Sequence, residues 1–142
     1  MRSEIYKDEG YKLMGAAFEV YNERGHGLGE EIYQESMEIE LDLRRIPYQA
    51  KRELLCYYKG RALKKYYVPD LWIFGSIVTE LKVVTHLLPK HEAQLVNYLR
   101  LTRRPVGYLI NFGRREELEW KRIIFSEFIA ARGSAQITKI SG

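Results

Sequence analysis

Cysteine, proline and histidine are scarce in this chain, and their scarcity excludes several classes of protein. Of 142 residues, one is cysteine, four are proline and three are histidine. The single Cys56 allows no internal disulfide, and its Leu-Leu-Cys-Tyr setting indicates a buried small side chain and not a nucleophile. None of the histidines stands at a zinc-ligand spacing from it. A disulfide-rich scaffold and a zinc finger are excluded, and we expect a protein of the reducing cytoplasm.

Long apolar runs are also missing. No run approaches the length of a membrane span, and Met1-Arg2-Ser3-Glu4 lacks the apolar stretch of a secretory signal. A hydrophobic content of 46% with eleven tyrosines is nevertheless ample for a packed core. We expect one domain over residues 1–142, with its core at about 11–125 and a loosely held tail from Ala131. The net charge of +4 mildly favours a polyanionic partner.

Two amphipathic helices are predicted at the start of the chain. Apolar residues recur at helical spacing over residues 4–24, although Gly10 should weaken the first turns, so that the firm part begins near Tyr11. A second helix should span residues 30–44. Its residues form two stripes, namely Glu30, Tyr33, Met37 and Leu41 on one face, and Ile32, Ile39 and Leu43 on another. Two apolar stripes predict a helix largely enclosed by its neighbours.

Five strands and one further helix are predicted after Pro47. The strands are expected at about 48–58, 62–74, 76–85, 106–112 and 120–125, and the helix at 89–102. Pro69 should bend or break the second strand. The first three strands can form a meander, and the helix is then a crossover that makes the next strand parallel to the third. We therefore expect an α/β fold with a mixed β-sheet flanked by helices.

Three charged side chains should meet in the hairpin of the second and third strands. A turn at residues 74–76 would pair Asp70 directly with Glu80, and Lys82 would share their face because strand side chains alternate. Opposed side chains have Cβ atoms roughly 5 Å apart, where like charges repel. A divalent cation between the carboxylates is the commonest functional reason for such a pair. Oxygen ligands favour Mg²⁺ or Mn²⁺, and without metal one carboxylate should have a raised pKa.

These charges could instead be solvated on an exposed sheet face. Charged residues make up 30% of the chain, so such a spacing can arise by chance. The surrounding strands argue against exposure, because they are apolar at nearly every position, as strands covered on both faces are. Lys82 has two interpretations. It could orient water and stabilise charge on phosphoryl oxygens, or it could form a structural ion pair with Asp70 or Glu80.

Element order and motifs together resemble the PD-(D/E)XK nuclease superfamily, which has a restriction-endonuclease-like core. Pro69-Asp70 and Glu80-Leu81-Lys82 match its defining motifs. The chain is more specifically similar to the GxxExxY family within that superfamily, whose naming motif matches residues 27–33. Four further stretches resemble family blocks in the same order, at residues 15–20, 78–82, 91–99 and 107–113. Gly29 and His26 depart from the residues common in the family, but neither position carries a charged site residue.

The resemblance implies roles for six residues. Asp70, Glu80 and the main-chain carbonyl of Leu81 would be metal ligands, and Lys82 would be catalytic. Glu30 would join the acidic cluster, although a helix N-terminus favours a carboxylate by itself. Gln94 would contact the site or the substrate, although the local backbone could equally satisfy its amide. The implied activity is metal-dependent hydrolysis of phosphodiester bonds in nucleic acid.

Two other functions stay open from the sequence. The domain could be a non-catalytic module that binds nucleic acid or a protein and keeps the nuclease fold. The charged residues could also be a structural ion-pair network. The sequence does not decide between DNA and RNA, or between internal and terminal cleavage. It also leaves the oligomeric state open, although a small nuclease domain often works as a dimer.

Overall fold

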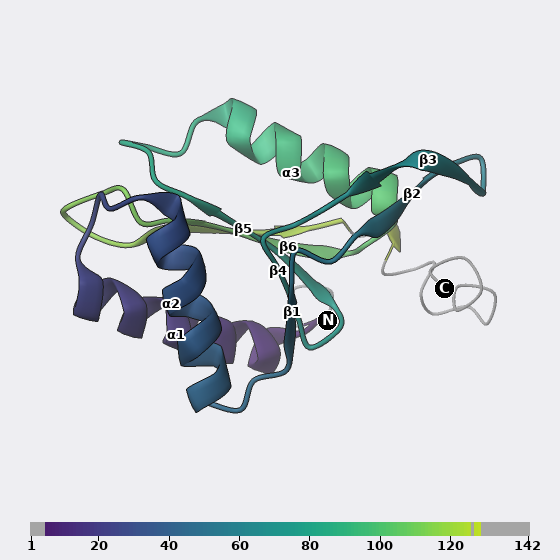
Figure 1. Ribbon diagram of the computed structural model, residues 1–142. Coiled ribbons are helices and arrows are strands. Elements are labelled where there is room, and N and C mark those ends of the chain that lie inside the picture. Colours follow the sequence, from purple (N-terminus) through teal and green to yellow (C-terminus); the bar gives the residue numbers. More distant parts are fainter. Residues whose placement is uncertain (1–4, 126, 129–142) are drawn as a thin grey trace.

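The structure, a computed structural model, describes residues 5–125, 127 and 128. The elements in chain order are α1 Lys7–Arg24, α2 Glu30–Leu43, β1 Tyr48–Ala50, β2 Leu54–Tyr58, β3 Arg61–Tyr67, β4 Leu71–Ile73, β5 Ile77–Lys82, α3 Pro89–Thr102, β6 Val106–Asn111 and β7 Glu119–Ile124. Figure 1 shows the sheet as a middle layer, with α1 and α2 on one side and α3 on the other. None of the described helices is long and apolar enough to cross a membrane. The tail predicted from Ala131 lies outside the described residues.

The main sheet has five strands in the order β1-β4-β5-β6-β7. β4 pairs antiparallel with both β1 and β5, so these three strands form the expected meander. α3 then crosses over the sheet, and β6 pairs parallel with β5, while β7 closes the sheet antiparallel to β6. The predicted mixed sheet flanked by helices is therefore confirmed.

A separate hairpin interrupts this meander, and here the strand prediction was wrong. The segments expected as continuous strands at 48–58 and 62–74 are each divided, and β2 and β3 pair only with one another. Lys51 leaves the extended conformation at the end of β1 with φ of 56°. Pro69 has no N–H to donate to a ladder, so pairing stops there before β4 begins. The hairpin is thus inserted between two neighbouring strands of the sheet.

The core has two parts, one on each face of the sheet. Side chains of α1, α2 and alternate sheet positions form the first cluster, which includes Ile77 and Leu81 of β5. The second cluster joins the hairpin and α3 to the opposite face, which includes Val78. Because strand side chains alternate, Glu80 and Lys82 share the face of Val78 and lie on the α3 side. Cys56 belongs to this second cluster, and burial raises the pKa of its thiol, as expected of a small core residue.

Helix α1 begins before Tyr11, where the weakening effect of Gly10 had led us to expect its firm part to begin. The helix already starts at Lys7, and Gly10 is buried inside it. A Cβ atom at this position would lie 1.9 Å from the hydroxyl oxygen of Tyr108. Close packing against β6 therefore requires the glycine, and the tertiary contact overrides its low helix propensity.

The prediction that α2 is enclosed was also wrong. Tyr33, Met37 and Leu41 are fully buried, whereas Ile39 is 53% and Leu43 72% exposed. Since α2 packs on α1 and the sheet with one face only, its second apolar stripe faces outward. Periodicity alone does not distinguish a helix covered on two faces from one with an exposed apolar stripe.

Asn111 fastens the connection between β5 and α3. Its Oδ1 accepts hydrogen bonds from the backbone N–H groups of Val84 and Gly113, each at 2.9 Å. Its Nδ2 donates to the carbonyl of Val84 and to Glu119. The side chain of Asn111 is completely buried and its partners are partly buried, so each partner would lose a bond that water replaces poorly.

We expect Asn111→Ala to lower the free energy of unfolding by about 2–4 kcal/mol because buried groups lose their partners. Urea denaturation measures this change. Asn97→Ala is the matched control, since Asn97 is exposed on α3 and alanine suits a helix. Equal stabilities of the two variants would contradict the role assigned to Asn111.

Candidate active site

The β4–β5 hairpin brings Asp70 and Glu80 together in the predicted register. Leu71 pairs with Thr79 and Ile73 with Ile77, so one further step places Asp70 opposite Glu80. The reversal is tight because Phe74 and Gly75 both have positive φ, at 57° and 65°. The two acids therefore leave the same face of the sheet, and the geometric prediction is confirmed.

Asp70 is fixed from two sides. Its Oδ2 accepts a hydrogen bond from the backbone N–H of Leu81 at 2.8 Å. Its Oδ1 receives the ammonium of Lys51 at 2.5 Å. The amide of Gln34 on α2 also donates to the main-chain carbonyl of Asp70 at 3.0 Å. These contacts hold the carboxylate at the place where β4 begins.

Glu80 is partly buried beside this carboxylate and resists ionisation. Burial, followed by the negative charge of Asp70, raises the pKa of Glu80 to about 8. The hydroxyl of Tyr67 donates to Oε2 of Glu80 and offsets part of this shift. Burial and the Glu80 charge in turn raise the pKa of Tyr67. One carboxylate of the pair thus has a raised pKa, as the sequence analysis expected.

Lys82 lies two residues further along β5, on the same face as Glu80. It is partly buried, and it forms no ion pair with an acidic side chain of the described residues. The structural ion pair with Asp70 or Glu80 is therefore not present, and Lys51 takes that place at Asp70. Burial lowers the pKa of the His91 imidazole on α3, and the nearby positive charge of Lys82 lowers it further. The ammonium of Lys82 remains available for an anionic ligand.

Glu30 and Gln94 are exposed, whereas the two carboxylates of Asp70 and Glu80 are partly buried. Glu30 is exposed at the first position of α2, after an exposed loop, and makes no hydrogen bond or ion pair with any described residue. Glu30 shares the stripe of Tyr33 and Met37 but is itself exposed, because the buried part of that stripe starts one turn later. Gln94 is exposed on α3, with its amide 3.5 Å from the hydroxyl of Tyr98. Their roles in the site stay predictions.

Sequence reasoning missed Lys51, Tyr67 and Gln34. Tyr67 contacts Glu80 and also stacks on Tyr98 of α3, with ring centroids 3.9 Å apart. Lys51 and Tyr67 flank the inserted hairpin, which brings them to the acids although they are far apart in the chain. No local pattern signals such partners, because the strand prediction had placed these residues inside long continuous strands.

The carboxylate pair fits one hard divalent cation. Two adjacent acids, one of which has a pKa raised first by burial and then by the charge of the other, gain from a positive ion between them. The ammonium of Lys51 at Asp70 shows that this oxygen accepts a cation. Within the described part of the chain, no group of three His, Cys, Asp or Glu side chains gathers as a metal site. Asp70 and Glu80 would hold the ion, and a carbonyl and waters would complete its shell.

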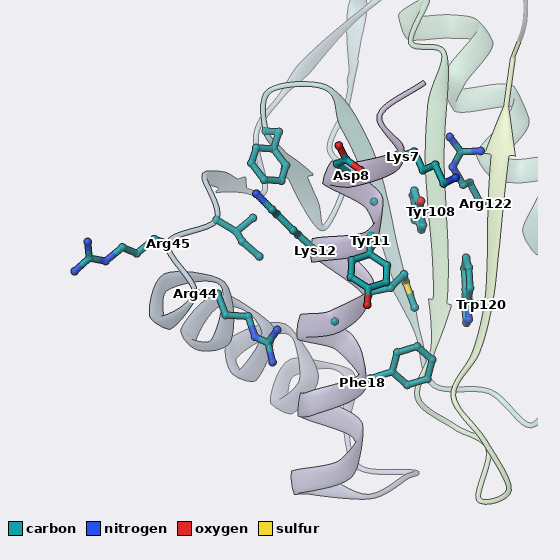
Figure 2. Close-up of a pocket in the computed structure, with 15 residues that line it drawn as sticks. Lys7, Asp8, Tyr11, Lys12, Phe18, Arg44, Arg45, Tyr108, Trp120 and Arg122 are labelled. Atoms are coloured by element: carbon teal, nitrogen blue, oxygen red, sulfur yellow. The ribbon is translucent and has the colours of Figure 1, made fainter. Parts of the chain in front are cut away.

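A hollow on the opposite face is not part of this site. A groove of about 1040 Å³ runs along α1, where Tyr11, Lys12, Tyr108, Trp120 and Arg122 contribute to its walls (Figure 2). Tyr108 belongs to the core cluster on the α1 side of the sheet, whereas Glu80 lies on the α3 side. Asp8 is the one acidic residue among those that line the groove. It offers no carboxylate pair comparable to Asp70 and Glu80.

Comparison with known proteins agrees with this geometry. The family model of the PD-(D/E)XK nuclease superfamily matches residues 7–123. The chain belongs to this superfamily. Pro69-Asp70 and Glu80-Leu81-Lys82 have the residue types that the name of the superfamily spells, and their roles stay predictions. The more specific GxxExxY assignment stays a prediction.

Structural comparison supports the same fold. The crystal structure of a protein named SSO0001 is similar with a TM-score of 0.53 and 22% sequence identity. The match covers 78% of this chain and 57% of that protein, so the chain spans little more than half of its structural relative. At this identity the likeness concerns the fold alone. No match was found among curated proteins.

Proposed function

We propose that this domain hydrolyses phosphodiester bonds of nucleic acid with the help of a divalent metal ion. The supporting observation is the placement of Asp70 opposite Glu80, with Lys82 on the same face and without an acidic partner among the described residues. Membership of a nuclease superfamily makes this chemistry the natural use of the pair.

Each residue of the pair has a distinct task in this proposal. When bound, a Mg²⁺ or Mn²⁺ ion would supply Lewis-acid activation of water and neutralise charge on the phosphoryl group. Asp70 would bind the ion through the carboxylate that Leu81 N–H and Lys51 already orient. Glu80 would bind as its anion and therefore release the proton that its raised pKa retains. The hydroxyl of Tyr67 would keep donating to Oε2 and fix the carboxylate.

Lys82 would act on the substrate and not on the ion. Its ammonium can donate to a non-bridging phosphoryl oxygen, where negative charge increases during attack by water. It can also orient the attacking water by a hydrogen bond. Glu30 would assist at the edge of the site, and Gln94 with Tyr98 would border the substrate on the α3 side.

A binding module without catalysis is the second candidate. The ion pair of Lys51 with Asp70 favours it, because an internal ammonium competes with a metal for the same oxygen. A module of this kind would bind nucleic acid through its basic surface and leave the carboxylates as structural groups. It predicts binding that weakens with salt, without turnover.

Calorimetric titration with Mg²⁺ and with Mn²⁺, paired with a cleavage assay on mixed nucleic acids, tests the proposal. We expect Asp70→Ala to weaken metal binding at least about 10-fold because it removes a charged ligand. Asp8→Ala is the matched control, since Asp8 is an exposed acid in the first turn of α1, on the other side of the sheet (Figure 1). Unchanged metal affinity in Asp70→Ala, or no cleavage at any metal concentration, would contradict the proposed function.

A further inference from the structure

The inserted hairpin carries the basic character of the whole chain. Residues 51–67 contain six lysines and arginines against one glutamate, which gives this stretch a charge of +5. The net charge of the complete chain is +4, so everything outside the stretch is slightly acidic, at −1. The basic pairs elsewhere in the sequence are balanced by acids in the sum, although the groove along α1 also has several basic residues in its lining.

These charges are free to meet a ligand. Lys59, Arg61, Lys64 and Lys65 are all exposed, and none forms an ion pair with an acidic side chain in the described part of the chain. Tyr58 at the tip and Tyr66 on β3 are 64% and 47% exposed. The exposed ribbon therefore combines basic side chains with two exposed tyrosines, and clustered basic residues are typical of nucleic-acid-binding surfaces.

The hairpin has the shape of an arm. Figure 1 shows β2 and β3 reaching past the end of α3, beyond the body of the domain. The base is anchored by Leu54, Cys56 and Tyr67 in the core cluster on α3, whereas β3 is exposed from Arg61 to Tyr66. A register shift between Leu55 and Tyr57 interrupts the ladder, and such irregularities bend and twist a ribbon.

Both ends of this arm lead into the candidate site. Lys51 precedes β2 and pairs with Asp70, and Tyr67 ends β3 and donates to Glu80. A nucleic acid that lies along the ribbon is thereby directed toward the two carboxylates. This connection distinguishes the hairpin from the groove on α1, which lies on the other face of the sheet.

We propose that the β2–β3 hairpin binds double-stranded DNA and presents it to the carboxylate pair, an inference that builds on the proposed nuclease function. The major groove of B-form DNA is wide enough for a two-stranded ribbon, whereas that of A-form RNA is deep and too narrow. Lysine and arginine on the ribbon then neutralise phosphates on either side of the groove. The ligand class is therefore a DNA duplex, and its contacts are mainly to the phosphate backbone.

Fluorescence anisotropy with labelled 20-base-pair DNA, in EDTA so that nothing is cleaved, tests this inference on the full chain. The variant Lys64→Gln/Lys65→Gln should bind about 10-fold more weakly at low salt and reduce the slope of log affinity against log salt by about 2. Lys59→Gln/Arg61→Gln should show a similar loss. The matched control is Lys7→Gln/Arg45→Gln, which removes the same charge from the α1 groove and should bind like the wild type. Single-stranded DNA and double-stranded RNA of equal length should bind more weakly than duplex DNA.

Three results would overturn the inference: equal losses in hairpin and groove variants, tighter binding of single-stranded DNA or of RNA, or unchanged affinity in both hairpin variants. The last result would leave the lysines as solubilising charges on an edge strand. The two proposals fail separately. If metal-dependent cleavage is unchanged in the hairpin variants, only the proposed role of the hairpin is refuted. If duplex binding depends on the hairpin but no cleavage occurs, only the proposed nuclease function is refuted.

Discussion

Replacement of Lys82 by methionine should abolish nucleic acid cleavage and leave the metal site intact. Lys82 shares a face with Glu80 but has no acidic partner among the described residues, so its ammonium is available for the substrate. Removal of one preorganised donor to a developing oxyanion typically costs about 100- to 1000-fold in rate. Methionine keeps the length of the side chain, which limits the loss of packing at the partly buried end of β5.

Single-turnover cleavage at saturating Mg²⁺ measures this effect, and calorimetry measures metal affinity in the same variant. Lys90→Met is the matched control, because Lys90 is an exposed lysine in the first turn of α3. If Lys82→Met cleaves as fast as Lys90→Met, Lys82 has no catalytic role. Loss of cleavage together with loss of folding would instead indicate a structural role, which circular dichroism detects.

The second large effect is a loss of stability with rising pH that depends on Glu80. The folded state raises the pKa of Glu80 from its ordinary 4.5 to about 8, so folding takes up a proton between these values. A carboxyl with a raised pKa contributes its full stability below about pH 4.5 and loses it as the pH rises through about 8. At about 1.4 kcal/mol per pH unit, a shift from 4.5 to about 8 makes the loss on the order of 5 kcal/mol.

Glu80→Gln isolates this contribution, because an amide resembles the protonated acid and can still accept the Tyr67 hydrogen bond. The free energy of unfolding of the wild type, relative to Glu80→Gln, should fall from pH 5 to pH 8.5. Chemical denaturation at several pH values checks this. The control Glu53→Gln, at an exposed acid of the hairpin, should show no such trend. A constant difference between wild type and Glu80→Gln would mean that Glu80 ionises normally.

Metal should reverse the same trend. A divalent cation favours the ionised form of Glu80, so added Mg²⁺ should raise the melting temperature more at pH 8.5 than at pH 6. This readout concerns binding alone and does not need catalysis. It therefore complements the cleavage assay on the Lys82 variant.

The charged hairpin was accessible to sequence reasoning because its rules are local. A turn centred on Gly75 fixes the register of the two strands that it joins, and strict alternation then fixes the face of each side chain. Asp70, Glu80 and Lys82 could be placed on one face without any knowledge of the rest of the fold. The raised pKa of one carboxylate was also expected, from the repulsion between the two charges, whereas burial contributes more to the pKa of Glu80.

The partners of these residues were not accessible in this way. Residues 48–58 and 62–74 could continue through the sheet or leave it as a separate hairpin. The outcome depends on which strand edges of the sheet are already paired. The two alternatives have almost the same local pattern. The insertion nonetheless decides that Lys51 and Tyr67 reach the acids, and that a strongly basic ribbon stands out from the domain.

Helix α2 shows the same division between local pattern and packing. Its two apolar stripes are real, but only the contact with α1 and the sheet decides which stripe is buried and that Glu30 is exposed. The sequence by itself determined the helices, the crossover and the opposed carboxylates, since helical period, proline and turn geometry act over a few residues. Only the tertiary structure decided how the acids are neutralised and where the positive charge gathers. Both depend on contacts between segments that are far apart in the sequence, and local patterns carry no information about such contacts.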